Sequence, residues 1–343
     1  MTDNSAIPTP LDLATMSRSR LRQLCTRVGG TPLVPLELRL PGGHRLFLKL
    51  EGENPGGSSK DRPALRIIED LEATGQLSAG CVIADSTSGN FGVSMAWICR
   101  ARGYQFHAVS DPNATVENVQ RMRALGAVVE IVDQRDEVGG YLLTRLRRVD
   151  ELVRIGVADL SSNQYENPAN PASHHATTGP ELVRQLDQPP DAVFICASTG
   201  GTLGGISRYL RQSWPSTMII AVDGEGSSLF GGTPGPRLIN GLGSSRPSPF
   251  VSQTDYDEVI RVDASVAISY CRELAHRHGF WVGGSSGAVI AAAVSRLRSA
   301  GRPQSVVCLC PDHGGLYLNS IFRDEWARSR GGLITVAQLA DHR

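Results

Sequence analysis

The sequence has no excess of charge of either sign, because 34 lysines and arginines balance 34 aspartates and glutamates over 343 residues. This balance argues against a nucleic-acid-binding protein and against a membrane-surface protein. No apolar run approaches the length of a transmembrane helix, and the N-terminus shows no signal-peptide core. We therefore expect a cytoplasmic protein that acts on small molecules, with neither a membrane nor a nucleic acid as partner.

Patterns of metal ligands and of disulfide bonds are also missing from the sequence. The seven cysteines are odd in number and scattered, and most of them lie inside apolar segments. This usage is typical of core thiols in a reducing compartment. Cys308 and Cys310 share an expected strand without a nearby partner, and His174 and His175 lack a third ligand. We expect no metal site and no catalytic cysteine.

The length and the pattern of the chain favour two lobes of the α/β class. The chain is longer than one hydrophobic core usually supports, and it contains no solenoid repeat and no coiled-coil heptads. Strands are expected at 44–50, 81–85, 104–109, 128–132, 192–196, 218–222, 259–262 and 305–310. Helices are expected at 64–77, 90–102, 116–125, 138–154, 178–186, 202–212, 266–278 and 286–298. This alternation favours parallel sheets with helices on both faces and a cleft between the lobes.

Lys60 lies in a loop rich in glycine and serine, between an expected strand and an expected helix. A helix N-terminus carries partial positive charge, so we expect the pKa of the Lys60 amine to be lowered. A neutral lysine amine is the form that Schiff-base chemistry requires. A solvated surface lysine at a helix start would show the same local pattern.

Three further glycine-rich turns each lead into an expected helix, at 85–92, 198–205 and 283–287. Hydroxyls and unpaired backbone N–H groups at a helix N-terminus bind carboxylates and phosphates. The 198–205 turn lacks the lysine of a P-loop and does not have the spacing of a dinucleotide-binding fingerprint. Taken alone, the turns at 85–92 and 283–287 are also explained as ordinary helix caps, and a lone glycine-rich loop such as 198–205 is a weak signal.

Together these segments resemble the fold-type II pyridoxal-phosphate enzymes, and within them the cysteine synthase and cystathionine β-synthase group. Residues 54–62 are similar to the family's Asn-Pro-x-x-Ser-x-Lys-Asp-Arg motif, and residues 87–90 to its Thr-Ser-Gly-Asn substrate loop. Further similar segments follow in the family's order, at 164–171, 178–181, 199–202 and 283–287. The resemblance spans residues 28–318 and implies a two-lobed, tryptophan synthase β-like α/β fold. In that fold, parallel-rich twisted sheets are flanked by helices and the cofactor lies in the cleft between the lobes.

The resemblance also assigns domains and residue roles. It implies a large cofactor-binding domain formed by 1–52 and 167–343, a small mobile domain formed by 53–166, and a homodimer. Lys60 would hold pyridoxal 5′-phosphate as an internal aldimine and would take the substrate's α-proton. The other implied cofactor-binding residues are Asn90 at the ring 3′-oxygen, Ser285 at the ring nitrogen, and Ser198, Thr199, Gly200, Gly201 and Thr202 at the phosphate. The implied residues for the substrate carboxylate are Thr87, Ser88, Gly89 and Gln164.

The implied reaction is β-replacement, in which an O-activated serine loses its leaving group to give an aminoacrylate and a nucleophile then adds. Asp85-Ser86 stands where sulfhydrylases carry Glu-Pro, and Tyr165 replaces a common phenylalanine. With the segment 311–326, these departures resemble the subgroup that joins O-phosphoserine and glutamate into N-(2-amino-2-carboxyethyl)-L-glutamate. This product is a precursor of 2,3-diaminopropionate in siderophore and peptide-antibiotic pathways. Two acidic substrates need cationic or hydroxyl hydrogen-bond donors, and the candidates are Arg145, Tyr165 and Ser198. The alternative for Arg145 is a position on a solvated helix face.

Four other interpretations stay open. A cysteine synthase or an O-ureidoserine-type synthase would have the same fold and a smaller nucleophile. A serine or threonine dehydratase would use the same lysine and release ammonia. A noncatalytic binding homologue would keep the fold without turnover. A nicotinamide dehydrogenase would need a better glycine pattern and an acidic ribose partner, for which Asp223 is the nearest candidate.

Overall fold

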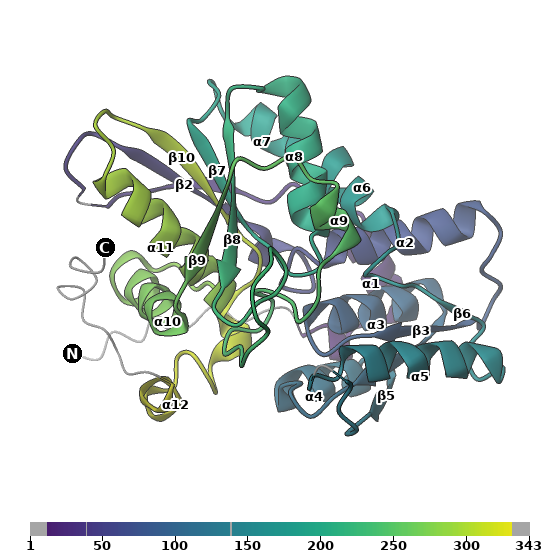
Figure 1. Cartoon of the computed structure of the whole chain (residues 1–343). Coiled ribbons are helices and arrows are strands. Elements are labelled where there is room, and N and C mark those ends of the chain that lie inside the picture. Colours follow the sequence, from purple (N-terminus) through teal and green to yellow (C-terminus); the bar gives the residue numbers. More distant parts are fainter. Residues whose placement is uncertain (1–11, 39, 138, 331–343) are drawn as a thin grey trace, which may run out of the picture.

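The computed structural model describes residues 12–38, 40–137 and 139–330, which form two lobes that lie side by side (Figure 1). The larger lobe contains a six-stranded sheet in the order β1-β2-β10-β7-β8-β9. Its strands are β1 (Leu33–Leu36), β2 (Arg45–Leu50), β7 (Ala192–Cys196), β8 (Met218–Gly224), β9 (Glu258–Val262) and β10 (Ser305–Cys310). All neighbouring strands run parallel except β1 and β2.

Helices cover both faces of this sheet, because its central strands are apolar on both sides. Phe194 and Cys196 of β7 belong to one core with helix α11, whereas Val193 and Ile195 belong to the opposite core with helices α7 and α8. The helices of this lobe are α6 (Ala169–Ala176), α7 (Thr178–Gln185), α8 (Gly201–Ser213), α9 (Pro249–Ser252), α10 (Ala264–Glu273), α11 (Gly284–Arg298) and α12 (Asp324–Ser329). Short 3-10 helices cover Leu13–Thr15, Glu51–Glu53 and Gly314–Tyr317, and a π-helix at Leu274–His278 continues α10.

The smaller lobe contains a four-stranded parallel sheet in the order β5-β4-β3-β6. Its strands are β3 (Val82–Ser86), β4 (Gln105–Ser110), β5 (Val128–Ile131) and β6 (Leu160–Ser161). Its helices are α1 (Arg18–Cys25), α2 (Asp61–Ala73), α3 (Asn90–Arg102), α4 (Val116–Ala124) and α5 (Leu142–Arg154). Helices α1 to α4 contribute to the core on one face of the sheet, and α5 packs on the other face.

The expected α/β architecture is therefore confirmed, and the differences are local. The helix expected over 138–154 begins at Leu142, and residue 138 lies outside the described residues. Helix α6 begins within the stretch 161–171, where we expected neither a helix nor a strand. Pro171 lies in the first turn of that helix, where a proline's missing N–H is not needed.

The N-terminal helix α1 packs differently from the division of domains that the resemblance implied. That division placed residues 1–52 in the large domain, of which residues 1–11 lie outside the described residues. Leu21, Leu24 and Cys25 of α1 are buried in the core of the smaller lobe, where α1 packs on α3. The reason is the apolar face of this short helix, which only the smaller lobe covers.

Helix α6 lies where the two lobes meet, and it packs on both α8 of the larger lobe and α2 of the smaller lobe (Figure 1). A second connection runs through the loop before α2, because the backbone N–H of Ser59 donates to the carbonyl of Pro311 at 2.7 Å. Both connections lie beside the carboxyl ends of the strands. Among the described helices, none has the length and apolarity needed to cross a bilayer.

Candidate active site

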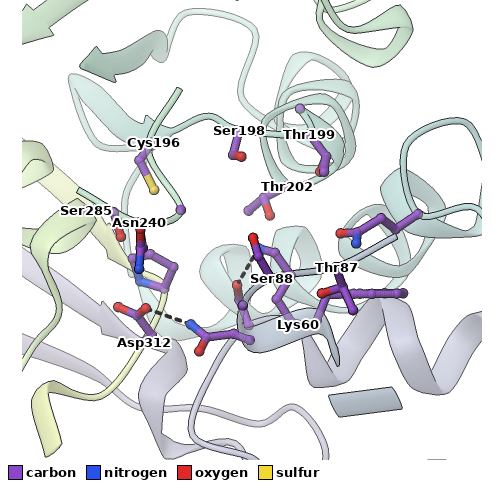
Figure 2. A pocket seen from close by; sticks show the side chains of 18 of the residues that line it. Lys60, Thr87, Ser88, Cys196, Ser198, Thr199, Thr202, Asn240, Ser285 and Asp312 are labelled. Carbon is purple, nitrogen blue, oxygen red and sulfur yellow. Dashed lines mark hydrogen bonds between the residues drawn. The ribbon is translucent and has the colours of Figure 1, made fainter. Parts of the chain in front are cut away.

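A pocket lies between the lobes, beyond the carboxyl ends of β3, β7 and β10. This is the place where open parallel sheets bind ligands. Every sequence-predicted site residue lines it except Gly201 and Arg145, and Figure 2 shows several of these side chains turned toward one another. The predicted residues that line it are Lys60, Thr87, Ser88, Gly89, Asn90, Gln164, Tyr165, Ser198, Thr199, Gly200, Thr202 and Ser285.

Four helices begin at this pocket: α2 at Asp61, α3 at Asn90, α8 at Gly201 and α11 at Gly284. Each N-terminus carries a partial positive charge and unpaired N–H groups. Among the described residues that line the pocket, Lys60 is the one cationic side chain. The pocket therefore suits anionic groups because of its backbone more than because of its side-chain charges.

Lys60 stands at the N-cap of α2, and its Nζ lies 3.4 Å from the hydroxyl of Ser59. Burial in the pocket lowers the pKa of the Lys60 amine, while Cys196, Asp312 and Glu51 oppose the shift. The expected direction of the shift is thus confirmed, although burial is its main cause. A lysine amine with a lowered pKa is suited to nucleophilic and proton-transfer chemistry.

The turn before α8 forms a cup of backbone donors. Gly200 has a φ of +88°, which favours glycine, and in the described structure the N–H groups of Thr199 and Gly200 have no hydrogen-bond partner. A Cβ on Gly201 would lie 2.1 Å from Oδ1 of Asn170, so a larger residue would displace that side chain. Unpaired N–H groups at a helix start fit a phosphate group.

His174 supports this cup from α6, a role that the sequence did not reveal. Its Nε2 lies 3.1 Å from Oγ1 of Thr202, and its Nδ1 lies 2.9 Å from Oγ1 of Thr178. Burial lowers the pKa of His174 to about 3, so the ring is neutral near pH 7 and one nitrogen donates while the other accepts. The pair His174-His175 lies in the last turn of α6.

The loop at 87–90 is held from inside the smaller lobe. Oγ1 of Thr87 accepts a hydrogen bond from the N–H of Gly92 at 2.9 Å, so this hydroxyl also caps α3. The side-chain amide of Gln164 donates to the carbonyl of Ser86 at 2.9 Å. Burial raises the pKa of Asp85 to about 6, although hydrogen bonds from Ser162 and Gln164 oppose this shift. Gln164 is thus fixed beside the loop.

Asp312 and Cys196 line the pocket without having been predicted as site residues. Nδ2 of Asn90 donates to Oδ2 of Asp312 at 2.8 Å, and the hydroxyl of Tyr317 donates to the same oxygen. All seven cysteines are unbridged and buried, as expected. Burial raises the pKa of the Cys196 thiol to about 11, so it stays protonated and forms an uncharged wall of the pocket.

The two residues expected to bind acidic substrates, Arg145 and Tyr165, are placed differently. Arg145 is buried outside the pocket lining, with Nε 3.2 Å from Oδ2 of Asp111. The alternative that Arg145 lies on a solvated helix face is wrong, because the side chain is only 8% exposed. Tyr165 lines the pocket, and the guanidinium of Arg246 lies over its ring at 5.7 Å from the centroid.

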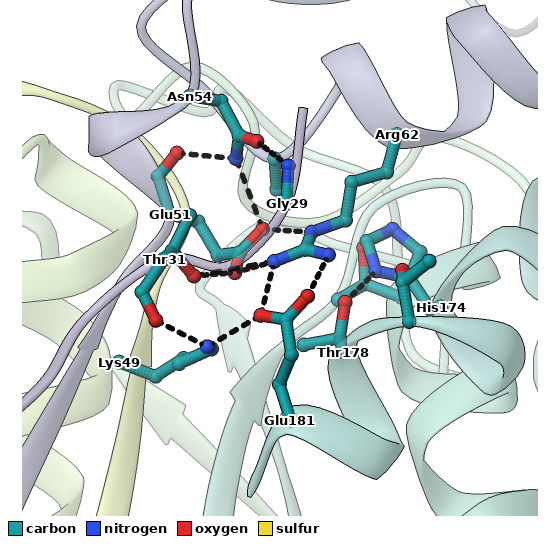
Figure 3. A network of polar contacts seen from close by, with 12 residues as sticks. Gly29, Thr31, Lys49, Glu51, Asn54, Arg62, His174, Thr178 and Glu181 are labelled. Atoms are coloured by element: carbon teal, nitrogen blue, oxygen red, sulfur yellow. Dashed lines mark hydrogen bonds and ion pairs between the residues drawn. The ribbon is translucent and has the colours of Figure 1, made fainter. Parts of the chain in front are cut away.

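A network of buried charges surrounds Arg62, near the start of α2 (Figure 3). The guanidinium of Arg62 donates to both oxygens of Glu51 and both oxygens of Glu181, at 2.6 to 2.7 Å. Lys49 donates to Glu181 at 2.6 Å, so two cations balance two carboxylates. Burial opposes ionisation of Glu51, but Arg62 and Lys49 hold its pKa at about 2. The network fixes the start of α2 on the larger lobe.

Comparison with known proteins gives a consistent picture. Residues 24–312 match the protein family described as Pyridoxal-phosphate dependent enzyme. The N-(2-amino-2-carboxyethyl)-L-glutamate synthase of Ralstonia nicotianae is 44% identical over 322 residues, which cover 92% of this chain and 95% of that protein. The synthase of the same name from Cupriavidus metallidurans is 40% identical over 318 residues, with 91% and 93% covered.

Solved structures are similar over almost the whole chain. The crystal structure of O-ureido-L-serine synthase matches with a TM-score of 0.82 at 30% identity, covering 92% of this chain and 98% of that one. The crystal structure of an O-acetylserine dependent cystathionine β-synthase from Helicobacter pylori matches with a TM-score of 0.81 at 31% identity, covering 87% and 97%.

Proposed function

This chain belongs to the family of pyridoxal-phosphate dependent enzymes, and from that premise we propose that it catalyses β-replacement on O-phospho-L-serine with L-glutamate as nucleophile. The product would be N-(2-amino-2-carboxyethyl)-L-glutamate, a precursor of 2,3-diaminopropionate. The observation that carries the proposal is a half-buried lysine, with the pKa of its amine lowered, in a pocket at which four helices begin. The names of two relatives that match more than nine tenths of the chain support the choice of glutamate.

The residues of the pocket fit the cofactor. The unpaired N–H groups of the turn before α8, together with the hydroxyls of Ser198, Thr199 and Thr202, would hold its phosphate. Asn90 would donate to the ring oxygen, and the hydroxyl of Ser285 would face the ring nitrogen. A hydroxyl does not hold that nitrogen protonated as a carboxylate would, which favours loss of a β-substituent over transamination.

The chemistry of the chain itself rests on Lys60. When bound, the cofactor supplies an electron sink for negative charge at the substrate's α-carbon. The Lys60 amine, whose pKa is lowered by burial, takes the α-proton and later returns it. Thr87, Ser88, Gly89 and Gln164 hold the substrate carboxylate at the start of α3. The bond from the β-carbon to the phosphate oxygen breaks, and the glutamate nitrogen bonds to that carbon as it loses a proton.

Tyr165 and the guanidinium of Arg246 would recognise the acceptor, L-glutamate. Arg246 stacks over Tyr165, and its ion pair to Glu166 is long, at 3.9 Å. Because this ion pair is weak, the guanidinium of Arg246 would also bind a carboxylate of the acceptor beside Tyr165. Ser198 adds a hydroxyl nearby. Arg145 remains only a sequence-based candidate, since Asp111 is its neighbour in this structure.

The test is product analysis with purified enzyme and cofactor. With O-phosphoserine and ¹⁵N-labelled glutamate, we expect release of one phosphate per product and transfer of the label to the new C–N bond. In D₂O the product should carry deuterium at the α-carbon of the serine-derived part. Repeated turnover of O-phosphoserine without glutamate, with pyruvate and ammonia as products, would refute the proposal; release of a single phosphate per enzyme site would not, because the leaving group departs before glutamate adds.

A cysteine synthase-type activity is the alternative, favoured by the similarity to O-ureido-L-serine synthase and to an O-acetylserine dependent enzyme. These structures share about 30% of their residues with this chain, fewer than the two synthases do. Competition between sulfide and glutamate for O-phosphoserine and O-acetylserine distinguishes the two functions. Preference for sulfide with either donor would establish the alternative.

We further propose a homodimer in the cytoplasm, in which residues 53–166 form a mobile small domain. Seven unbridged cysteines support a reducing compartment. The separate core of the smaller lobe supports independent movement, and α1 would move with it. Light scattering would measure the mass of the particle, and small-angle scattering with and without O-phosphoserine would detect closure of the lobes.

A further inference from the structure

We propose that Asp312 is a positioning residue, whose carboxylate fixes which atom of the Asn90 side-chain amide faces the pocket. An asparagine amide has nearly the same shape at its oxygen and its nitrogen ends, so its orientation is set by its hydrogen-bond partners. Oδ2 of Asp312 accepts from Nδ2 of Asn90 at 2.8 Å. A carboxylate oxygen as partner selects the nitrogen end of the amide.

Asp312 is itself held in place from several directions. The hydroxyl of Tyr317 donates to the same Oδ2. The N–H of Gly283 donates to the carbonyl of Asp312 at 3.2 Å, and a Cβ on Gly283 would lie 2.1 Å from Oδ1. The residue is only 4% exposed. A carboxylate packed in this way cannot rotate to follow Asn90, so Asn90 must adapt to it.

The contact joins the two lobes inside the pocket. Asn90 is the first residue of α3 in the smaller lobe, and Asp312 follows β10 in the larger lobe, 222 positions further along the chain. In Figure 2 a dashed line marks this hydrogen bond where it meets the carboxylate of Asp312. The larger lobe therefore determines the orientation of a side chain that the smaller lobe carries.

The consequence concerns the cofactor site, and this step rests on the proposed function. Nδ2 carries two hydrogens, and Asp312 uses one of them. The other is left as a donor for an acceptor atom in the pocket, such as the ring oxygen assigned to Asn90. If the amide were reversed, its oxygen would face that acceptor and repel it. Asp312 thus acts through Asn90.

The test measures cofactor affinity and a spectrum besides activity. Apo-protein is titrated with pyridoxal 5′-phosphate, and the ratio of the visible absorption bands of the lysine-bound cofactor is recorded. We expect Asp312→Ala to weaken binding roughly 10- to 100-fold and to shift the band ratio, as loss of a hydrogen bond to a charged group predicts. Asp312→Asn, whose amide oxygen still accepts, should stay within about threefold of the wild type.

A double-mutant cycle separates positioning from structural support. In the Asn90→Ala background, Asp312→Ala should change the affinity less than about twofold. Equal losses in both backgrounds would overturn the proposal, as would unchanged affinity and spectrum in the single variant. Tyr317→Phe provides a second variant if Asp312→Ala does not fold: it should weaken binding about threefold, and only when Asn90 is present. A Tyr317→Phe loss that persists without Asn90 would equally refute the role.

Asp223 offers a matched control. It is a buried carboxylate on β8 of the larger lobe, and its Oδ2 has no hydrogen-bond partner in the described structure, but it does not line the pocket. Asp223→Ala should lower the melting temperature without changing cofactor affinity. Failure of the proposed function would be seen separately, because wild-type enzyme would then bind the cofactor normally and yet not join O-phosphoserine to glutamate.

Discussion

Replacing Arg62 by methionine tests whether the buried charge network holds the two lobes together. Arg62 lies two positions after Lys60 on α2, whose apolar face belongs to the core of the smaller lobe. Its guanidinium contacts two carboxylates of the larger lobe, Glu51 and Glu181. Methionine keeps most of the length of the side chain and removes the charge. Lys49 then remains as the single cation against two buried carboxylates.

Two arguments give the loss in the free energy of unfolding that Arg62→Met should cause. Removing one partner of a buried ion pair destabilises a protein by about 3–5 kcal/mol. Independently, the network holds the pKa of Glu51 at about 2 instead of the ordinary 4.5. That difference corresponds to about 3 kcal/mol, because each tenfold change in the ionisation constant is about 1.4 kcal/mol. Both routes predict a lower free energy of unfolding by several kcal/mol.

The loss of unfolding free energy caused by Arg62→Met should depend on pH in a defined direction. In the wild type, the pKa of folded Glu51 is below its unfolded value, so its contribution is present above pH 4.5 and is lost as the pH falls toward 2. Without Arg62, the buried carboxyl is stabilised by protonation instead. The difference in unfolding free energy between variant and wild type should therefore shrink as the pH is lowered from 7 to 4.5.

The assay is urea unfolding of cofactor-free protein, followed by far-ultraviolet circular dichroism at both pH values. Arg66→Met is the matched control, because Arg66 lies on the same helix and pairs with Asp70 at 2.7 Å with both side chains over 40% exposed. It should cost less than about 0.5 kcal/mol. Adding Glu51→Gln to Arg62→Met should recover part of the loss, since it removes the uncompensated charge.

A loss below about 1 kcal/mol for Arg62→Met at pH 7, or a loss that does not vary with pH, would refute this account of the network. The first result would mean that water or a rearranged Lys49 compensates the carboxylates. The second would mean that packing, and not charge, is what the arginine contributes.

Three further predictions follow from the site and its supports. Lys60→Ala should abolish turnover and the visible band of the lysine-bound cofactor while leaving the circular dichroism spectrum unchanged. Burial holds the pKa of His174 at about 3, against 6.5 for the free residue, so its contribution to stability is present above pH 6.5 and falls as the pH drops toward 3. Between pH 6.5 and 5 the free energy of unfolding of the wild type should fall by about 2 kcal/mol, and that of His174→Asn should not fall by this amount. His175→Asn is the control. Gly205→Ala places a Cβ 2.2 Å from a backbone oxygen of α6 and should cost about 1–3 kcal/mol by urea unfolding, whereas Gly204→Ala, whose nearest contact would be 3.0 Å, should cost less.

Local sequence was sufficient to predict most of the strands that form the sheets and the glycine-rich turns at their ends. The strand expected at 305–310 and the helix expected at 90–102 have those bounds in the structure. Such segments are predictable because period and end signals are local properties of the chain. The glycine-rich turns were predictable for the same reason, and most of their residues line one pocket.

Other features depend on contacts between distant positions. Asp312 reaches Asn90 across 222 positions and Arg62 reaches Glu181 across 119, and neither pairing leaves a local pattern. The ion pair of Arg145 was not predictable, because the sequence of a helix in isolation does not show that Asp111 lies beside it. His174 carried no signal, since its neutral state follows from burial between two threonine hydroxyls.

The lysine, the amide and the hydroxyl donors could be identified from the sequence alone, because they are particular residue types at predicted helix starts. The tertiary structure sets how those groups act together. It brings four helix N-termini to one pocket and buries Lys60, and this burial is what lowers the pKa of its amine. Desolvation and hydrogen-bond orientation are set by neighbours in space, and those neighbours exist only after the two lobes have packed.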